Sequence, residues 1–341
     1  MIRVPAFAFA IWLISGCGMM AEPTAQDTIE ELDNRLHSLI GPNARLEELA
    51  EGFVWSEGPV WIDSEDGGYL LFSDVPANKV HRWSESDGLS IWLDPSGYAG
   101  EDSEGFREAG SNGLIRSTDS GHILMADHGN RAIFEVDLAT KEKRILADRF
   151  EGKRFNSPND LAVDDDGTIY FTDPPYGLVG QDASKLKELA HNGVYARAND
   201  GSVSLIDRTL SRPNGIVLSP DRQTLYVANS DPARAVWVRY RRDGRSWGAG
   251  EVFFDATSMV REDAPGLPDG MAIAQDGTLF ATGPGGVFVF SPDGEHLGTI
   301  RTPRAVANVT FGGSNGSVLY LTVHDKLMRI ATKVTGAGFA P

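Results

Sequence analysis

Six short motifs along the chain each place an oxygen-bearing side chain at the start of an apolar run. Two of the side chains are carboxylates and four are carboxamides, and none of the six positions holds Lys, Arg or His. Such a set offers hard oxygen ligands and little else. The residues are Glu57 in SEGPVW, Asn112 in SNGL, Asn159 in SPNDL, Asn214 in RPNGIV, Asp269 in LPDGMA and Asn308 in VANVTF.

This chemistry favours a divalent cation, most readily calcium. Calcium accepts roughly six to eight oxygen ligands in variable geometry, whereas magnesium requires a stricter octahedron and zinc prefers nitrogen or sulfur. Turn formation is an alternative explanation, because Asn, Asp and Gly begin tight turns. It accounts for the prolines before Asn159, Asn214 and Asp269, but it does not require the long carboxylate of Glu57. We therefore predict a metal site at this register.

A second register follows 14–17 residues after each tip, where the next apolar run ends in Asp74, Asp127, Asp173, Asn229, Gly283 and, near it, His324. Asp173 in FTDPPYGL is a candidate general base, because the two prolines after it turn the chain away and present Tyr176 to the rim. The alternative role of Asp173 is to accept backbone N–H groups at the end of a hairpin.

The elements that must position these residues are β-hairpins. Each tip begins an alternating run, followed by a polar turn and a β-branched or aromatic run, and further strand–turn pieces give about four strands per unit. The tips from Glu57 to Asn308 span 251 positions in five intervals, a spacing of about 50 that is typical of propeller blades. We predict an all-β, six-bladed β-propeller of four antiparallel strands per blade, over residues 50–335. Helical periodicity is too scarce for a solenoid.

In a propeller the first strand of each blade lines a central channel, so the six tips should converge at one end of it. The composition agrees with a soluble β domain, since 41% of the 341 residues are hydrophobic and 23% are charged. The net charge of −17 argues against a nucleic-acid partner.

The first residues predict export. Arg3 precedes the apolar run Val4–Ile14, which ends in ISGC and resembles a bacterial lipobox. We predict a lipoprotein signal peptide over residues 1–17, lipidation of Cys17, a polar tether over residues 18–49, and a periplasmic or cell-surface protein whose only membrane contact is this anchor. An ordinary signal peptide or a buried thiol is the alternative. Cys17 is the single cysteine, so neither a disulfide nor a cysteine metal site can form within the chain.

Several motifs together resemble the gluconolactonase family, which is related to regucalcin and more distantly to paraoxonase-type lactonases. They are SEGPVW, KRFNSPNDLAVDDDGTIYFTDPPYGL, RPNGIVLSPD, YVANSD and PDGMAI, within roughly residues 50–330. SNGL, with Asn112, and HGNRAI, with His128, fit the secreted bacterial branch of this family.

The resemblance implies a propeller that binds a divalent cation, commonly calcium, and hydrolyses sugar lactones. It implies metal ligation by Glu57, Asn214 and Asp269, with Asn159 at or beside the metal and in contact with substrate. It also implies that Asp269 accepts and donates the proton.

We therefore expect a metal-polarised lactone carbonyl, attack by water, and either Asp269 or Asp173 as the base. A carboxylate on a metal is a weak base, which favours Asp173, whereas the resemblance favours Asp269. Asn112, Asn159, His128 and Tyr176 are the predicted substrate contacts. A calcium-stabilised propeller that binds a sugar or a protein at the cell surface without significant catalysis is the alternative function.

Overall fold

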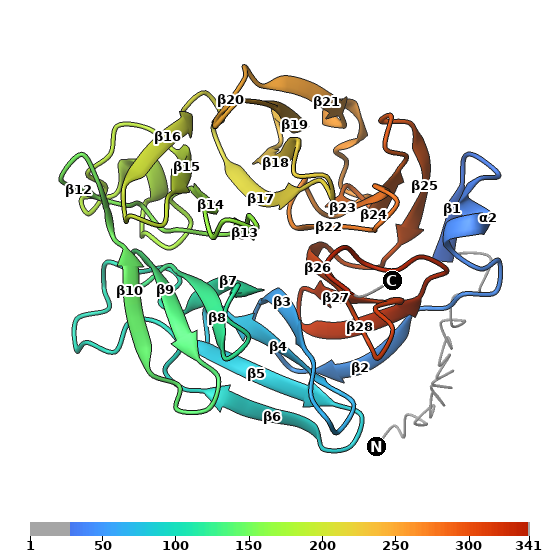
Figure 1. Cartoon of the computed structure of the whole chain (residues 1–341), viewed down its shortest axis with the longest axis horizontal. Coiled ribbons are helices and arrows are strands. Elements are labelled where there is room, and N and C mark those ends of the chain that lie inside the picture. Colours follow the sequence, from blue (N-terminus) through green and yellow to red (C-terminus); the bar gives the residue numbers. More distant parts are fainter. Residues whose placement is uncertain (1–27, 340–341) are drawn as a thin grey trace, which may run out of the picture.

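Six antiparallel sheets stand around a common centre (Figure 1) in the computed structural model, which describes residues 28–339. This arrangement confirms the predicted six-bladed β-propeller. Blade 1 contains β3 (Ser56–Ile62), β4 (Tyr69–Asp74), β5 (Lys79–Ser84) and β6 (Gly88–Leu93). Blade 2 contains β7 (Ser111–Arg116), β8 (His122–Asp127), β9 (Ala132–Asp137) and β10 (Lys143–Ala147). Blade 3 contains β13 (Leu161–Val163), β14 (Ile169–Asp173), β15 (Gly193–Arg197) and β16 (Val203–Asp207).

The remaining three blades complete the ring. Blade 4 contains β17 (Pro213–Leu218), β18 (Thr224–Asp231) and β19 (Arg234–Asp243), whose outer edge pairs with β20 (Ser246–Trp247) and β21 (Glu251–Asp255). Blade 5 contains β22 (Met271–Ile273), β23 (Leu279–Gly283), β24 (Gly286–Phe290) and β25 (His296–Arg301). Blade 6 contains β26 (Val306–Gly312), β27 (Val318–Val323), β28 (Lys326–Ala331) and an outer strand, β2 (Glu47–Glu51), that comes from the N-terminal side.

Burial along the strands follows their place in a blade. All seven residues of β3 are buried, because an innermost strand packs against the strands of both neighbouring blades. The outermost strand β6 is exposed over Leu89–Ile91. The apolar side chains between blades form the core, as where Val60 and Leu71 of blade 1 pack with Ile123 and Met125 of blade 2. Burying each such side chain stabilises the fold by about 1.5–3 kcal/mol.

The pairing of β2 with β28 closes the ring, because it joins the two ends of the propeller in one sheet (Figure 1). The loops contain short elements. β11 (Arg149–Phe150) pairs with β12 (Lys153–Arg154). Single 3-10 turns form at η1 (Gln181–Ala183) and η2 (Thr257–Met259). The sequence DASKLKELA, which begins at Asp182, contributes the end of η1 and a loop.

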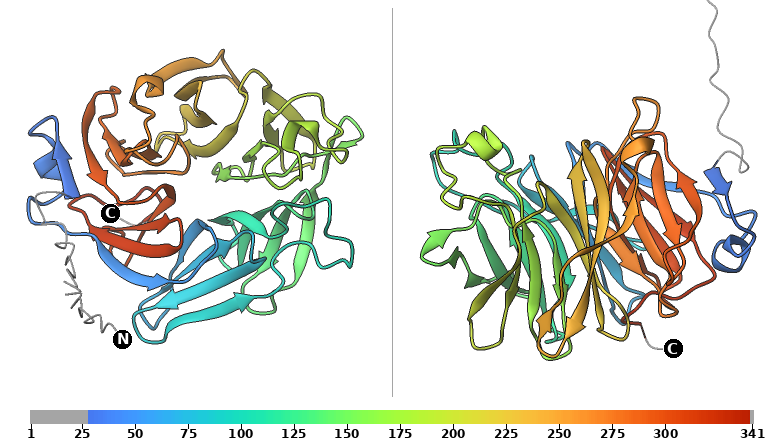
Figure 2. Two further views of the ribbon diagram at one scale, coloured as in Figure 1. Left: turned by 180° about the vertical axis from the view of Figure 1, so that it is seen from behind. Right: turned by 90° about the horizontal axis from the view of Figure 1, so that it is seen from above.

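The described part of the predicted tether, residues 28–49, belongs to the fold. β1 (Ile29–Glu31) extends blade 5 by pairing with β25, and α2 (Leu36–Leu39) packs beside it on the outer side of the ring (Figure 2). Leu36, Leu39 and Ile40 are buried in the core between blades 5 and 6. The tether prediction is wrong for this segment, because its apolar side chains cover an outer strand that would otherwise be exposed.

The predicted signal peptide of residues 1–17, including Cys17, lies outside the described residues, as do residues 18–27 of the tether. Within residues 28–339, no helix is long and apolar enough to cross a membrane.

Candidate functional site

One mouth of the central channel holds a cavity of about 790 Å³. Five of the six predicted tips line it, each from a different blade: Glu57, Asn112, Asn159, Asn214 and Asp269. Glu57, Asn112 and Asn214 stand near the start of β3, β7 and β17, and the other two lie two positions before β13 and β22. The fold thus brings together side chains that are separated by 212 positions along the chain, from 57 to 269.

The sixth tip, Asn308, lies at a different level. It lines a second cavity, further along the channel, together with Asp160 and Phe339. The Oδ1 atom of Asn308 accepts the N–H of Val309, at 2.8 Å. Ala305 and Val306 take its place in the wall of the upper cavity. The equal register predicted for blade 6 is therefore wrong by one residue, because Asn308 takes the position that Asp160, the residue after the tip, has in blade 3. In both, the backbone N–H donates to a threonine hydroxyl and Oδ1 accepts the N–H of the next residue.

Glycines beside the tips allow neighbouring blades to approach closely. A Cβ atom added to Gly58 would lie 2.1 Å from the backbone oxygen of Asn112, and one added to Gly215 would lie 2.1 Å from that of Asp269. Hydrogen bonds join the same levels, since the N–H of Gly113 donates to the Asn159 carbonyl at 2.8 Å. The tip dipeptides Glu-Gly, Asn-Gly and Asp-Gly therefore supply a functional side chain followed by a residue that permits contact between blades.

The amide nitrogens of three tip asparagines face protein acceptors. Nδ2 of Asn214 donates to Oγ of Ser230 at 2.9 Å. Nδ2 of Asn112 lies 3.3 Å from Nε2 of His128, and Nδ2 of Asn159 lies 3.5 Å from the same atom. Among the described residues, the Oδ1 atoms of Asn112 and Asn214 are buried and have no hydrogen-bond partner. Unpaired buried oxygens are costly, so they indicate a ligand.

The two tip carboxylates lie in a negatively charged environment. Burial raises the pKa of Glu57, an effect that the N–H of Gly58 opposes and the nearby Asp160 carboxylate reinforces. Burial also raises the pKa of Asp269, and the carboxylates of Glu57 and Asp160 raise it further. Within residues 28–339, neither Glu57 nor Asp269 forms a salt bridge, and Oδ1 of Asp269 has no hydrogen-bond partner. Both carboxylates therefore lack a compensating positive charge.

These residues fit a divalent cation in their chemistry. Carboxylate and amide oxygens are the donors that calcium prefers. They converge here on one cavity, and the Oδ1 atoms of Asn112, Asn214 and Asp269 have no partner among the described residues. No group of three or more His, Cys, Asp or Glu suited to a metal occurs among the described residues. A cation at this mouth would therefore depend on amide oxygens as well as on the two carboxylates.

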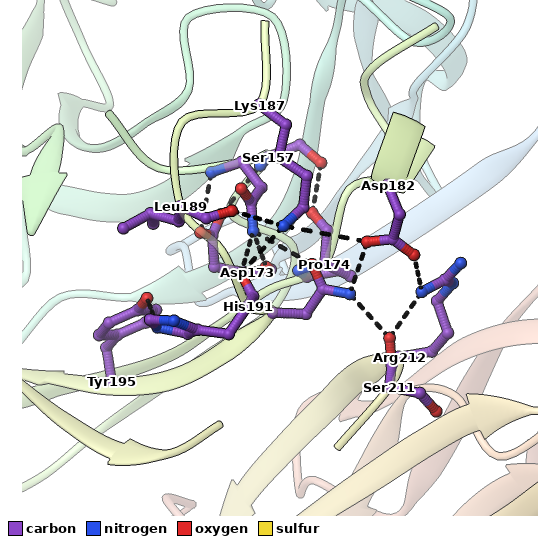
Figure 3. Close-up of polar contacts among 12 residues, drawn as sticks. Ser157, Asp173, Pro174, Asp182, Lys187, Leu189, His191, Tyr195, Ser211 and Arg212 are labelled. Carbon is purple, nitrogen blue, oxygen red and sulfur yellow. Dashed lines mark hydrogen bonds and ion pairs between the residues drawn. The ribbon is translucent and has the colours of Figure 1, made fainter. Parts of the chain in front are cut away.

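Asp173 does not line the cavity. It lies in a network of polar contacts outside the cavity wall (Figure 3). Its two carboxylate oxygens accept the N–H groups of Asn156 and Ser157, both at 2.8 Å. Burial raises the pKa of Asp173 to about 7, although these two N–H groups oppose the shift. The geometry therefore favours the alternative role stated above, a hairpin-end acceptor, and does not support the prediction of Asp173 as the base.

The same network fixes the loop that carries Tyr176. Oγ of Ser157 donates to the carbonyl of Pro174 at 2.6 Å and accepts the N–H of Gly177 at 3.0 Å. Farther along the loop, Asp182 pairs with Arg212 at 2.5 Å (Figure 3). Tyr176 lines the cavity as predicted, and burial and the Asp269 carboxylate raise its pKa above the ordinary range.

His128 lies behind the cavity wall instead of in it. Its side chain is fully buried, so the predicted direct contact with substrate does not agree with this position. Nδ1 of His128 lies 3.1 Å from Oε2 of Glu108, and Oε1 of Glu108 pairs with Arg107 at 2.9 Å. Asn112 and Asn159 separate the imidazole from the cavity.

Sequence reasoning missed Glu108, Ser230 and Asp160. Glu108 lies in a loop outside the repeat, so no periodic signal marks it. Ser230 follows Asn229 in YVANSD, and Asp160 follows Asn159 in SPNDL, so a wider reading of the repeated motifs could have included both. The oxygens of Asp160 accept the N–H groups of Leu161 at 2.9 Å and Ile216 at 3.3 Å, which links blades 3 and 4 below the ring.

Comparison with known proteins agrees with this geometry. Residues 55–325 match the SMP-30/gluconolactonase/LRE-like region. The chain is 43% identical to a gluconolactonase of Zymomonas mobilis over 314 residues, which cover 90% of this chain and 87% of that protein. These relatives confirm the prediction that the chain is an enzyme of the gluconolactonase type.

Solved structures place the chain in the same group. The structure of a Xanthomonas campestris gluconolactonase matches with a TM-score of 0.76 and 32% identity, covering 90% of this chain and 95% of that one. A calcium-binding protein, the regucalcin of Agrobacterium tumefaciens, matches with a TM-score of 0.66 and 20% identity over 87% of this chain and 97% of that one, which shows the shared fold. From the matched region and these relatives, the chain belongs to the SMP-30/gluconolactonase/LRE-like family.

Proposed function

We propose that this chain is a divalent-cation-dependent hydrolase that opens sugar lactones, with calcium as the cation. One observation carries the proposal: oxygen side chains from five blades converge on one cavity, and neither of their two carboxylates has a cationic partner within the described residues. The gluconolactonase relatives support the lactone as substrate, and the calcium-binding regucalcin with the same fold supports the choice of cation.

Glu57, Asn159, Asn214 and Asp269 would hold the cation. When bound, a divalent cation supplies Lewis-acid polarisation of an ester carbonyl. The chain's own residues orient the lactone: Asn112 and Tyr176 offer polar contacts to hydroxyl groups, and Trp55 and Leu267 form an apolar part of the wall. A cavity of about 790 Å³ admits a monosaccharide lactone with space for water.

Asp269 is the proposed base. It is the carboxylate whose Oδ1 atom is free of hydrogen bonds to the described residues inside the cavity. It would take a proton from the water that attacks the lactone carbonyl carbon. The bond from that carbon to the ring oxygen then breaks, and Asp269 returns the proton to this oxygen, giving a hydroxy acid.

Lactone hydrolysis by chelated and calcium-restored protein tests the proposal. With gluconolactone and other aldonolactones, we expect chelation to lower the rate by about 100-fold or more and calcium to restore it. Turnover that is unchanged by chelation would overturn the cation requirement. The absence of turnover with every lactone, in the presence of calcium, would overturn the reaction.

We also propose that the chain is an exported lipoprotein anchored through Cys17. The support is the ISGC sequence at the end of the apolar run Val4–Ile14. Mass spectrometry of the protein from bacterial membranes should find a lipid-modified N-terminal Cys17, and Cys17→Ser should release the protein from the membrane fraction. An unmodified Cys17 in the mature chain would contradict the anchor.

A further inference from the structure

His128 and Glu108 form a hydrogen-bonded pair beside two of the ring asparagines, with His128 behind the cavity wall and Glu108 in it. The side chain of His128 is 0% exposed and that of Glu108 is 12% exposed. The contact of 3.1 Å from Glu108 Oε2 to His128 Nδ1 is within hydrogen-bond range. A carboxylate can only accept, so Nδ1 carries the proton of this hydrogen bond.

The other ring nitrogen then has a defined role. In a neutral imidazole with a proton on Nδ1, Nε2 is an acceptor. The amide nitrogens of Asn112 and Asn159 both face this atom, at 3.3 and 3.5 Å. An acceptor at Nε2 attracts the NH₂ end of each side chain, so the oxygen end of each must point the other way, toward the cavity.

A third ring asparagine shows the same principle with different chemistry. The hydroxyl of Ser230 donates to the carbonyl of Pro268, so its oxygen is available to accept Nδ2 of Asn214 at 2.9 Å. There too the amide oxygen is left without a partner among the described residues. Two unrelated acceptors therefore produce the same orientation of the asparagine amides.

The surroundings of His128 are close-packed. Its backbone N–H donates to the carbonyl of Gly110 at 3.1 Å, and Gly177 packs so closely that an added Cβ would lie 2.7 Å from Cβ of His128. Gly177 belongs to the loop that carries Tyr176. The imidazole is thus held between two backbone segments and is kept away from water.

We propose that Glu108 and His128 are positioning residues that fix the side-chain amides of Asn112 and Asn159 with their oxygens toward the cavity. Their effect on cation and lactone binding rests on the proposed function, whereas the orientation of the amides does not. Residues that orient metal ligands typically change metal affinity by about 10–100-fold when they are replaced. His128 would therefore act on a substrate that it does not touch, whereas Glu108 also lines the cavity.

The first measurement is the tautomer of His128 in the chelated protein, read from the ¹⁵N NMR shifts of its ring nitrogens. We expect a proton on Nδ1 and none on Nε2. A proton on Nε2 would overturn the proposal, because this atom could no longer accept from the two amides. This readout is independent of cation binding and of turnover.

The second measurement compares His128→Gln with His128→Leu. Gln can place an acceptor oxygen near the position of Nε2, whereas Leu cannot. By calorimetric titration with calcium, we expect His128→Leu to bind about 10–100-fold more weakly and His128→Gln to remain within a few-fold of the wild type. Glu108→Ala should weaken calcium binding and remove the preference of His128 for a proton on Nδ1. His122→Gln, on a partly exposed histidine of β8, is the matched control.

The outcomes separate the two proposals. Equal calcium affinity in the wild type, His128→Gln and His128→Leu, with all three folded by thermal unfolding in chelator, would overturn the positioning role. Equal losses in His128→Gln and His128→Leu would also overturn it. If the wild type binds no calcium, the metal part of the proposed function fails. The KM for lactone in the same variants, with the tautomer, then decides whether the amide orientation serves substrate binding.

Discussion

Hydrogen bonds, and not salt bridges, distinguish the ring carboxylate of Asp269 from Asp173. The oxygens of Asp173 are occupied by backbone N–H groups, while Oδ1 of Asp269 has no partner among the described residues. From the sequence, either residue could be the base. Their hydrogen bonds now separate a carboxylate that supports the backbone from one that faces the cavity.

Asp269→Asn should therefore mainly affect catalysis, and Asp173→Asn should mainly affect stability. We expect Asp269→Asn to lower kcat for lactone hydrolysis by about 10²–10⁴-fold, the range for loss of a general base, without a large change in thermal stability measured in chelator. Asp173→Asn should mainly destabilise the protein, by about 1–3 kcal/mol, because one buried N–H loses its acceptor. A large loss of kcat in Asp173→Asn at unchanged stability would instead identify Asp173 as the base.

The buried Asp173 also predicts a dependence of stability on pH. Its pKa is about 7 in the fold and near 3.8 when the chain is unfolded. Between about pH 4 and 7 the folded state binds more protons, so this residue lowers the free energy of unfolding as pH rises, by at most about 1.4 kcal/mol per pH unit.

Asp173→Asn removes this contribution to the dependence of stability on pH. Denaturant unfolding in chelator should therefore show the stability advantage of the wild type over the variant shrinking from pH 4.5 to 7. A difference that stays constant or grows with pH over this range would contradict the raised pKa.

At the scale of elements, the tips of the inner strands serve both packing and chemistry. The glycines beside the functional side chains let adjacent blades meet, so the ring and the contacts between blades are set by the same dipeptides. A side chain added at one of these glycines would displace the tip of the neighbouring blade.

Gly215→Ala tests this coupling. Its Cβ atom would lie 2.1 Å from the backbone oxygen of Asp269, so the variant should lose about 1–3 kcal/mol of stability and much of its lactonase activity. Gly121→Ala is the control, because the nearest atom to its Cβ would lie at 3.6 Å, an ordinary contact. Equal melting temperatures for the two variants would argue against a tight contact between the tips.

The N-terminal segment supplies a second test at this scale. Leu36 of α2 is 2% exposed and packs in the core between blades 5 and 6, whereas Leu32 is 55% exposed. Leu36→Ala should destabilise the protein by about 2–5 kcal/mol, and Leu32→Ala should change stability by less than about 0.5 kcal/mol. Thermal unfolding that does not distinguish the two variants would restore the interpretation of this segment as a tether.

For the whole molecule, one cation would tie several blades together. Ligands from blades 1, 3, 4 and 5 would be joined at the axis, so binding to the folded state alone should raise the melting temperature. At a calcium concentration of about 100 times Kd, the added stability is about 2.7 kcal/mol. Differential scanning calorimetry with calcium and with chelator measures this difference.

Asp269→Asn should remove most of the calcium-dependent increase, since it removes one of the two ring carboxylates. Asp173→Asn should retain the increase, although it begins from a lower melting temperature. A calcium effect that persists in full in Asp269→Asn would place the stabilising cation elsewhere on the molecule.

The sequence alone determined the architecture, because the propeller repeats one hairpin pattern six times and repetition is visible without coordinates. It also determined which tips converge, since the first strands of all blades line the same channel. This argument identified five cavity residues correctly in position. It failed for Asn308, because the motif VANVTF does not reveal that this asparagine stands one position after its tip, as Asp160 does in blade 3.

Only the tertiary structure decided what surrounds those residues. Whether Asp173 or Asp269 has an oxygen free depends on backbone N–H groups from another turn, and the pairing of His128 with Glu108 joins a loop to a strand end. The burial of Leu36 likewise depends on blade 5 offering an uncovered edge. Such contacts join segments that the repeat does not relate, so spacing along the chain determines convergence while hydrogen bonding and charge are determined by packing in three dimensions.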